Sequence, residues 1–302
     1  MQSRTNGLVA APFTPFLPNG NLNLDQIPRL VDHYVTNELE GLFVCGSTGE
    51  GPSLTSAERM QVAEHFHDSA KGSLRLWIHI GHSSLAEAKI LAQHAQSLGV
   101  DAISATLPTY YKIESESVLI DCLQEISSAA ESTPFYYYHI PSLTGVVVDV
   151  VSLLESVQES IPNFAGIKFS SPALHDFQAC VVAVDKKFDM LYGADEMFLP
   201  ALSVGAQGFI GSTYNFMAPI YFQIRSAFES GDLVHARNLQ NWVIEVVRLL
   251  LKYGLLPTQK SIMHRLGLDC GPVRLPLKSP SKQDLNNFHH ALDSLDFFDR
   301  IT

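Results

Sequence analysis

The sequence contains few cysteines and no long apolar run. Only four of its 302 residues are cysteine, at Cys45, Cys122, Cys180 and Cys270. No two of them form a Cys-x-x-Cys pair, so a zinc site or a disulfide framework is disfavoured, and reduced thiols in a cytoplasm are expected. No stretch of about 18 uninterrupted apolar residues occurs, which predicts no membrane-spanning helix. Pro12 and Pro15 interrupt the N-terminal apolar run, which argues against a signal peptide.

Basic residues are also scarce. Lys and Arg number 20 against 31 Asp and Glu, which gives a net charge of −11. A surface of that sign disfavours nucleic acid and anionic membranes as partners, although a local site can still bind a small anionic substrate. The remaining composition, 46% hydrophobic and 17% charged, is that of an ordinary globular chain. Its length suits either two domains or one α/β barrel of roughly 250 residues with an appendage.

Eight short apolar runs alternate with segments of helical pattern. The runs cover Gly7–Pro12, Gly41–Cys45, Leu74–Gly81, Ala102–Leu107, Phe135–His139, Phe164–Phe169, Phe188–Tyr192 and Gly208–Gly211. Between the second and the fourth run, Thr55 to Glu58 and Ser84 to Glu87 have the pattern of capping boxes, which start helices. Each run is therefore expected to be a strand that is followed by a helix.

This alternation predicts the fold class. Strands that alternate with helices pair in parallel, and largely apolar strands are buried on both faces. Eight such units favour an α/β fold of the (β/α)8 TIM barrel type, with a doubly wound sheet as the alternative, because periodicity does not reveal closure. Helices are then expected over Ile220–Glu229, Leu233–Tyr253, Thr258–Leu266 and Ser281–Leu295. We expect a barrel over residues 1–230 and a C-terminal helical extension over residues 231–302 that packs on it.

In a barrel, catalytic groups lie at the C-terminal ends of the strands. There, Lys168 stands inside an otherwise apolar strand. Burial lowers the pKa of a lysine and yields a neutral amine that can attack a ketone, whereas the alternative is a lysine that reaches water or an ion-pair partner at the strand end. After the second strand, the segment Gly46–Gly51 (GSTGEG) suits either a backbone nest for a carboxylate or phosphate, or a plain turn in which glycine supplies positive φ.

Two further strand ends carry polar groups. In the fifth strand, period two places Tyr136 and Tyr138 on one face and Tyr137 on the other. All three could fill the core, but a phenol near the mouth at Tyr138 could relay protons. After the seventh strand, Asp195 and Glu196 could accept hydrogen bonds from hydroxyls, do acid/base work or cap the next helix. No His or carboxylate stands at a fixed spacing that would support a metal site there.

Taken together, the ordered motifs GSTGEG, YYYHIP, GIKFSS, GADE and GSTYN are highly specific. The chain resembles the pyruvate-dependent class I aldolases of the dihydrodipicolinate synthase and N-acetylneuraminate lyase superfamily, and within it the N-acetylneuraminate lyase branch. The resemblance runs from Ala10 to Pro276. It implies a TIM barrel with C-terminal helices, a homotetramer, and no metal or organic cofactor.

The resemblance also implies roles for particular residues. Lys168 matches the Schiff-base lysine and Tyr138 the proton-relaying tyrosine. Tyr110 matches an aromatic residue inserted into a neighbouring subunit's site, although its context leaves Tyr111 as the other candidate. Residues expected to bind the pyruvyl carboxylate and the sugar part are Ser47, Thr48, Ser170, Gly193, Asp195, Glu196 and Ser212.

The expected activity is reversible cleavage of N-acetylneuraminate, a sialic acid, to N-acetylmannosamine and pyruvate. One alternative is another pyruvate-dependent aldolase, either a dihydrodipicolinate synthase or a 2-keto-3-deoxy sugar-acid aldolase. The other is a non-enzymatic sugar-acid-binding regulator. The presence of both Lys168 and Tyr138 argues against the regulator, since a protein that only binds its ligand needs neither.

Overall fold

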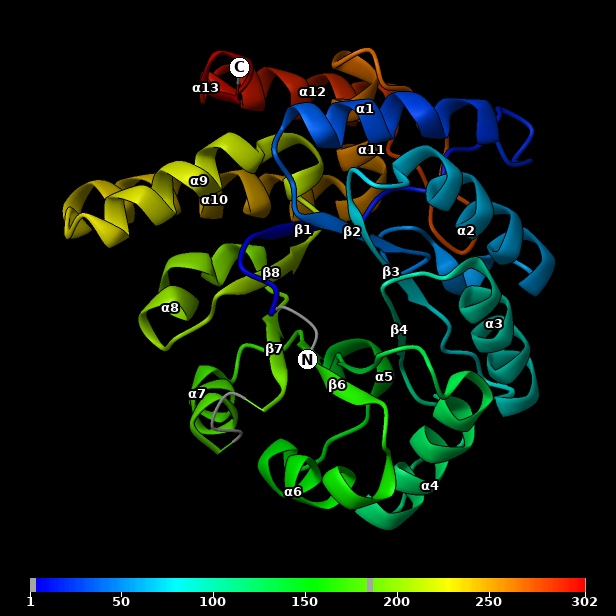
Figure 1. Cartoon of the computed structure of the whole chain (residues 1–302). Coiled ribbons are helices and arrows are strands. Elements are labelled where there is room, and N and C mark those ends of the chain that lie inside the picture. Colours follow the sequence, from blue (N-terminus) through cyan, green and yellow to red (C-terminus); the bar gives the residue numbers. More distant parts are fainter. Residues whose placement is uncertain (1–3, 184–186, 302) are drawn as a thin grey trace.

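The computed structural model describes residues 4–183 and 187–301. Its eight strands are β1 Leu8–Ala10, β2 Gly41–Val44, β3 Arg75–His79, β4 Ala102–Ala105, β5 Phe135–His139, β6 Phe164–Phe169, β7 Asp189–Tyr192 and β8 Gly208–Gly211. Each strand pairs in parallel with the next, and β8 pairs with β1, which closes the barrel (Figure 1). The prediction of a (β/α)8 barrel is confirmed, and the doubly wound alternative is wrong.

Helices connect the strands and surround the barrel (Figure 1). They are α1 Ile27–Thr36, α2 Ser56–Ala70, α3 Leu85–Leu98, α4 Glu116–Ser127, α5 Pro141–Thr144, α6 Val150–Ser160, α7 Leu174–Ala183, α8 Phe198–Ser203 and α9 Tyr214–Glu229. Single 3-10 turns are η1 Leu24–Gln26, η2 Gly51–Ser53, η3 Ser128–Ala130 and η4 Asp195–Met197. The C-terminal helices are α10 Leu233–Tyr253, α11 Leu255–Arg265, α12 Lys282–Asp293 and α13 Phe297–Ile301.

The predicted strands differ from the observed ones only at their ends. The run Leu74–Gly81 contains β3 Arg75–His79, and Ala102–Leu107 contains β4 Ala102–Ala105. Ile80 and Leu107 lie beyond these strands but stay buried in the core. A run of apolar residues indicates burial and does not show which residues pair with a neighbouring strand. The predicted strand is therefore too long where the loop that follows it is also buried.

Three helix predictions need correction. The helix expected over Ile220–Glu229 begins at Tyr214, because one turn precedes a break at Met217 (φ −126°, ψ 15°) close to Pro219. The helix expected from Thr258 begins at Leu255. The capping box at Thr55 is complete, whereas that at Ser84 is only half formed. The Glu87 carboxylate does not return to the backbone of Ser84, because it accepts a hydrogen bond from Ser56 instead (2.5 Å).

The side chains inside the barrel form a small cluster of their own. It consists of Val9, Ala11, Phe43, Trp77, Ala102, Tyr136, Tyr138, Leu191 and Ile210. Tyr137 belongs to the larger core between the strands and the helices, as period two predicts. Inside the barrel, the Tyr136 hydroxyl donates to Asp189 at the first residue of β7 (3.2 Å), which places it at the end away from the mouth. Tyr138 lies two residues nearer the C-terminal ends of the strands.

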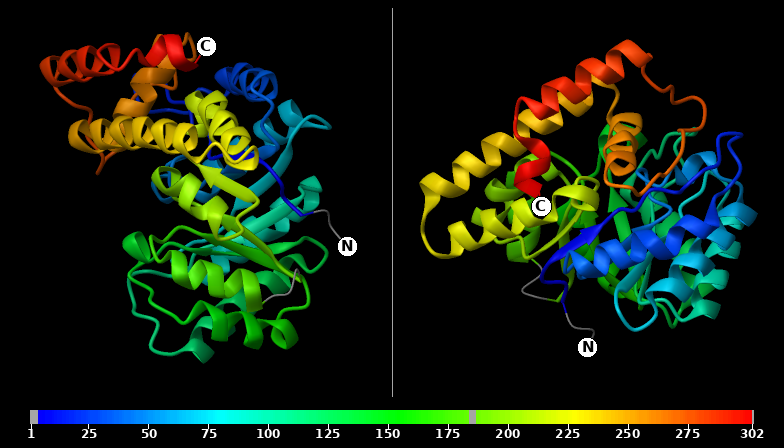
Figure 2. Two further views of the ribbon diagram at one scale, coloured as in Figure 1. Left: turned by 90° about the vertical axis from the view of Figure 1, so that its left-hand side faces the viewer. Right: turned by 90° about the horizontal axis from the view of Figure 1, so that it is seen from above.

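The C-terminal helices lie together on one side of the barrel (Figure 2). Helix α10 packs along α9 and against α8 and η4, while α12 packs on α10 and α13 packs on α9. The Trp242 ring on α10 stacks on Phe297 (centroids 5.7 Å apart), and its Nε1–H donates to the carbonyl of Leu295 (3.0 Å). The extension thus reaches the barrel elements that follow β7 and β8.

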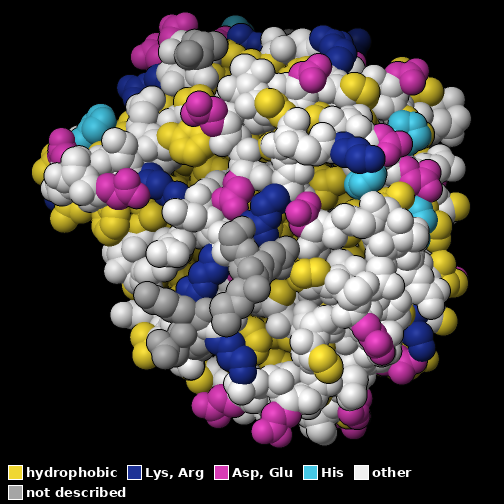
Figure 3. Space-filling model, in the orientation of Figure 1, with side chains coloured by type: hydrophobic (Ala, Val, Ile, Leu, Met, Phe, Trp, Pro, Cys, Tyr) yellow, Lys and Arg dark blue, Asp and Glu magenta, His cyan; other side chains and the backbone are white. Residues whose placement is uncertain are grey.

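The surface seen in Figure 3 carries basic and acidic side chains interspersed with each other. Within the described part of the chain, no helix is long and apolar enough to cross a membrane. Over the same residues, no group of three or more His, Cys, Asp or Glu side chains is arranged to hold a metal ion.

Candidate active site

A cavity of about 450 Å³ lies at the C-terminal ends of the strands. Nine of the ten residues predicted for the site line it: Ser47, Thr48, Tyr138, Lys168, Ser170, Gly193, Asp195, Glu196 and Ser212. Tyr110 does not line it, since its side chain is 82% exposed beyond β4. Residues that are up to 165 positions apart in the sequence therefore meet in one cavity, because parallel strands bring their carboxyl ends to one face of a barrel.

Lys168 is the fifth residue of β6 and is only 4% exposed. Its Nζ lies over the rings of Phe43 (3.7 Å to the centroid) and Tyr138 (4.0 Å). No carboxylate within the described residues forms an ion pair with it, so it neither reaches water nor neutralises a partner. Burial lowers the pKa of Lys168 to about 7, with Asp195 opposing that shift. A substantial fraction of this amine is therefore neutral near pH 7 and able to act as a nucleophile.

Tyr138 lies directly beside Lys168, since the two residues are register partners on β5 and β6. Its hydroxyl is within 3.5 Å of the Ser47 hydroxyl, which belongs to the loop after β2. Burial raises the pKa of Tyr138, and the Ser47 hydroxyl opposes the shift. The phenol thus keeps its proton near neutrality and has a polar neighbour through which that proton can pass.

The loop Gly46–Gly51 follows β2 and carries Ser47 and Thr48. None of the hydrogen bonds of the described residues uses the backbone N–H of Ser47 or Thr48, so both N–H groups are available to a ligand anion. The alternative in which glycines supply positive φ here is wrong. The residues with positive φ are Cys45 (59°) and Glu50 (53°), not the glycines. Gly51 is required for a different reason, because a Cβ there would collide with the carbonyl oxygen of Cys45.

A buried ion pair fixes the end of this loop. Glu50 accepts a hydrogen bond from Lys260 Nζ (2.7 Å) and another from the backbone N–H of Arg274 (2.7 Å). Lys260 also donates to the carbonyls of Thr14 (3.1 Å) and Pro272 (2.9 Å). The C-terminal extension thereby holds the loop that carries Ser47 and Thr48, and both charges of the pair are fully hydrogen-bonded.

Lys260→Met should destabilise the fold strongly. Methionine keeps much of the side-chain volume but leaves the Glu50 carboxylate buried with a single partner, which typically costs about 3–5 kcal/mol. Urea denaturation measures the free energy of unfolding. The matched control is Lys89→Met, because Lys89 pairs with Glu125 at the exposed surface, where a pair contributes about 0–1 kcal/mol. Equal losses in the two variants would contradict this assignment.

Asp195 and Glu196 are adjacent but differ in environment. Asp195 is buried in η4, and its Oδ2 accepts from the N–H and hydroxyl of Thr213 (both 2.8 Å) and from Ser212 (3.3 Å). Burial raises the pKa of Asp195 to about 6, against the donors from Thr213. The Glu196 side chain is exposed to the cavity and forms no hydrogen bond or ion pair with any described residue. Glu196 is therefore the carboxylate free to accept from a ligand, while Asp195 orders the loop after β8.

Ser170 and Gly193 form the wall between β6 and β7. A Cβ on Gly193 would collide with the Ser170 side chain, so the glycine is required for that hydroxyl to lie where it does. The Ser170 Oγ is buried and lines the cavity, and no hydrogen bond of good geometry joins it to another described residue, although this hydroxyl lies near enough to the Tyr138 phenol to oppose the rise in its pKa. It is available to hydrogen-bond a ligand.

Several lining residues were not predicted from the sequence. Val247, Leu251, Leu255 and Gln259 reach the cavity from the C-terminal extension. The first three resemble any apolar helix residue, and Gln259 belongs to no motif. Val247 and Leu251 belong to α10 and Leu255 and Gln259 to α11, so no pattern within a single helix shows that these residues meet at the barrel mouth.

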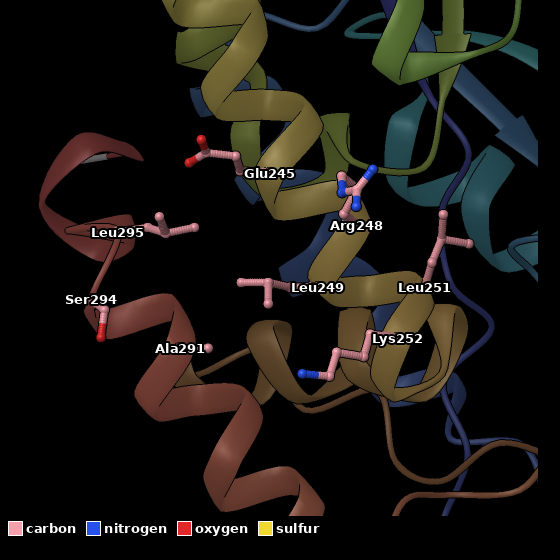
Figure 4. Close-up of a pocket in the computed structure, with 8 residues that line it drawn as sticks. All are labelled: Glu245, Arg248, Leu249, Leu251, Lys252, Ala291, Ser294 and Leu295. Atoms are coloured by element: carbon pink, nitrogen blue, oxygen red, sulfur yellow. The ribbon is translucent and has the colours of Figure 1, made fainter.

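A second hollow lies between α10 and α12 and is larger, about 930 Å³ (Figure 4). Figure 4 shows Leu249 of α10, Ala291 of α12 and Leu295 beside it, with Glu245 and Lys252 farther along α10. No residue from a strand end lines this hollow. The larger hollow therefore contains none of the residues predicted for the site, whereas the smaller cavity contains Lys168 and the loop with the unpaired N–H groups of Ser47 and Thr48.

The chain is similar over nearly its whole length to several known proteins. The sequence matches the Dihydrodipicolinate synthetase family over residues 4–295. It is 43% identical over 291 residues to N-acetylneuraminate lyase A of Xenopus laevis, covering 95% of this chain and 94% of that protein. It is 40% identical to the human N-acetylneuraminate lyase, covering 98% and 94%. The solved N-acetylneuraminate lyase of Proteus mirabilis superposes with a TM-score of 0.95 at 33% identity, covering 98% of this chain and all of that one.

Proposed function

This chain belongs to the dihydrodipicolinate synthetase family, and on that basis we propose that it is a carbon–carbon lyase which reversibly cleaves N-acetylneuraminate to N-acetylmannosamine and pyruvate. The observation that carries the proposal is the buried, unpaired amine of Lys168 beside Tyr138 at the barrel mouth. A protein that only bound sugar acids would gain nothing from holding a lysine in a site that disfavours its charge.

The reaction begins at Lys168. Its neutral amine adds to the keto carbon of the open-chain sugar acid, and loss of water gives an iminium. The C4 hydroxyl loses its proton, the C3–C4 bond breaks, and the electron pair enters the iminium to form an enamine. N-acetylmannosamine leaves as the aldehyde. Protonation of the enamine at C3 and hydrolysis then release pyruvate and restore the amine. The iminium accepts the electrons, so this chemistry needs no metal or organic cofactor.

Tyr138 and the loop after β2 serve this sequence. The Tyr138 hydroxyl lies beside Lys168 and within 3.5 Å of Ser47, so it can move a proton between the substrate and that hydroxyl. The free N–H groups of Ser47 and Thr48 hold the substrate carboxylate and so fix the keto carbon beside the amine. Ser170, Glu196 and Ser212 face the polyhydroxyl part, and Gly193 and Asp195 keep them in place.

Leu143 on α5 favours a sugar substrate over a small dianion. Dihydrodipicolinate synthases usually carry an arginine at this position, which helps bind the carboxylate of aspartate semialdehyde. Leu143 lines the cavity and offers no donor, so that carboxylate loses a charge-assisted partner worth about 1.5–3 kcal/mol. Glu196 would also repel it.

We therefore expect purified protein to release pyruvate from N-acetylneuraminate and to condense pyruvate with aspartate semialdehyde negligibly. A coupled assay for pyruvate measures the first reaction, and loss of the semialdehyde measures the second. Leu143→Arg should raise the second activity. More efficient use of aspartate semialdehyde than of sialic acid by the wild-type protein would show that the substrate assignment is wrong, whereas the Schiff-base chemistry could still hold.

The protein is further proposed to act as a homotetramer in the cytoplasm. Tyr110 and Tyr111 lie after β4, both more than 80% exposed, with their rings in edge-to-face contact (centroids 5.2 Å apart). Such a pair suits insertion into a neighbouring copy, with Tyr110 entering that copy's site. Leu143 and Val147 are exposed apolar side chains as well. All four cysteines are free thiols, which suits a reducing compartment.

A further inference from the structure

Gln259 on α11 has a carbonyl oxygen without a partner. Its side chain is fully buried, 0% exposed, yet lines the cavity that contains Lys168. The Nε2 group donates to the Ser212 hydroxyl (2.9 Å), while Oε1 has no hydrogen bond with any residue that the structure describes. A buried acceptor left unpaired is unfavourable. A buried, unpaired acceptor beside a ligand cavity gains a hydrogen bond when a bound ligand supplies the donor.

The hydrogen-bond chain fixes which end of the amide is free. The ionised Asp195 carboxylate can only accept, so the single hydroxyl proton of Ser212 is donated to it (3.3 Å). Ser212 must then accept from the amide, which assigns the NH2 group of Gln259 to that contact. The carbonyl oxygen is consequently the end that remains available, and reversing the amide would leave Ser212 without a donor.

The position of Gln259 indicates which part of the substrate it meets. Through Ser212 and Asp195 it is bonded to the loops after β8 and β7, rather than to the Ser47 loop that holds the carboxylate. Val247, Leu251 and Leu255 precede it at four-residue intervals and line the same cavity. Gln259 is thus the polar group of an otherwise apolar wall that the C-terminal extension adds to the barrel.

We propose that the Gln259 carbonyl accepts a hydrogen bond from a hydroxyl of the polyhydroxyl part of the substrate and so contributes to recognition of the sugar aldehyde. This inference rests on the proposed function and adds to it a specificity residue from outside the barrel. A site that holds an unpaired acceptor discriminates in favour of ligands that supply the donor.

Gln259→Met tests the proposal, because methionine keeps the length and most of the volume of the side chain while removing both polar ends. In the condensation direction, the KM for N-acetylmannosamine should rise about 3–10-fold, the range expected for one neutral hydrogen bond. The kcat should change less than twofold. The apparent Kd for pyruvate, measured by borohydride trapping on the enzyme, should stay within twofold of wild type.

The matched control is Gln240→Met on α10. Gln240 is also a buried glutamine of the extension, but both ends of its amide are satisfied, by the N–H of Leu199 (2.8 Å) and the carbonyl of Glu196 (2.9 Å). Removal of the Gln240 amide leaves two buried backbone groups without hydrogen-bond partners, so the Tm of Gln240→Met should fall by about 4 °C or more. The Tm of Gln259→Met should change by less than about 2 °C, because the substitution also removes an unpaired acceptor.

The outcomes separate the two proposals. If the wild-type protein fails to cleave N-acetylneuraminate, the proposed function is overturned. If the wild type is active and Gln259→Met leaves the KM for N-acetylmannosamine within twofold, only the inference about Gln259 is overturned. The inference is overturned equally by a matching rise in the Kd for pyruvate, or by a fall in Tm as large as that of Gln240→Met. Either result would make Gln259 a purely structural residue.

Discussion

Lys168→Met should abolish turnover of N-acetylneuraminate and remove the site of covalent labelling. The physical reason is that methionine occupies the same pocket between Phe43 and Tyr138 but has no amine to add to the keto carbon. Borohydride reduction in the presence of pyruvate should add one pyruvyl-derived mass to the wild-type peptide that contains Lys168 and none to the variant. Lys89→Met, which changes an exposed lysine on α3, should keep both turnover and labelling.

The same residue should give the reaction a defined pH dependence. Imine formation needs the neutral amine, and the pKa of Lys168 lies near 7, so trapping at low pyruvate should rise with pH between about 6 and 8. The unfolded chain keeps that proton up to a pKa of about 10.4, so burial of this amine lowers the wild-type free energy of unfolding near pH 7, and that loss shrinks as the pH rises from about 7 to 10. Lys168→Met does not incur this loss and should unfold at a higher Tm than wild type near pH 7.

Normal turnover by Lys168→Met, or labelling of another lysine, would show that the nucleophile lies elsewhere. A lower Tm in that variant would indicate instead that the buried amine stabilises the fold. The labelling and stability measurements are independent, so a loss of activity caused by misfolding is separable from a loss of the nucleophile.

Tyr138→Phe should lower kcat about 10²–10⁴-fold, the usual contribution of a positioned acid/base group. The ring still fills its place over Lys168, so pyruvate should continue to be trapped on that lysine. The phenol proton is lost, and with it the path from the substrate to Ser47. Steady-state kinetics on N-acetylneuraminate, combined with trapping, measures both effects on the same preparation.

Tyr136→Phe is the control for this change. The two tyrosines belong to the same strand and the same face, but the Tyr136 hydroxyl donates to Asp189 at the far end of the barrel (3.2 Å). Its removal should cost about 1 kcal/mol of stability and leave kcat close to wild type. A near-normal kcat for Tyr138→Phe, or an equal loss in the two variants, would return Tyr138 to the role of a core aromatic.

Much of this protein follows from local features of its sequence. Eight apolar runs separated by helical segments predict the barrel, because burial on both faces makes a parallel strand apolar along its length. Period two on β5 separates Tyr136 and Tyr138 from Tyr137. A lysine within an apolar strand is conspicuous for the same reason, since burial of its charge has a cost that an ordinary surface lysine does not incur. These signals are local, and a linear sequence displays them.

Other properties were decided only by the tertiary structure. Nothing in the sequence distinguishes Asp195 from Glu196. In the fold, Thr213 and Ser212 donate hydrogen bonds to the Asp195 carboxylate, and the Glu196 carboxylate stays free for a ligand. Gln259 belongs to no motif, and it borders the cavity only because α10 and α11 fold back over the barrel mouth. Each of these outcomes depends on contacts between segments far apart in the chain. Hydrogen bonds between such segments depend on how the helices and strands pack against one another. Residue types and their spacing within a single helix or strand do not reveal that packing.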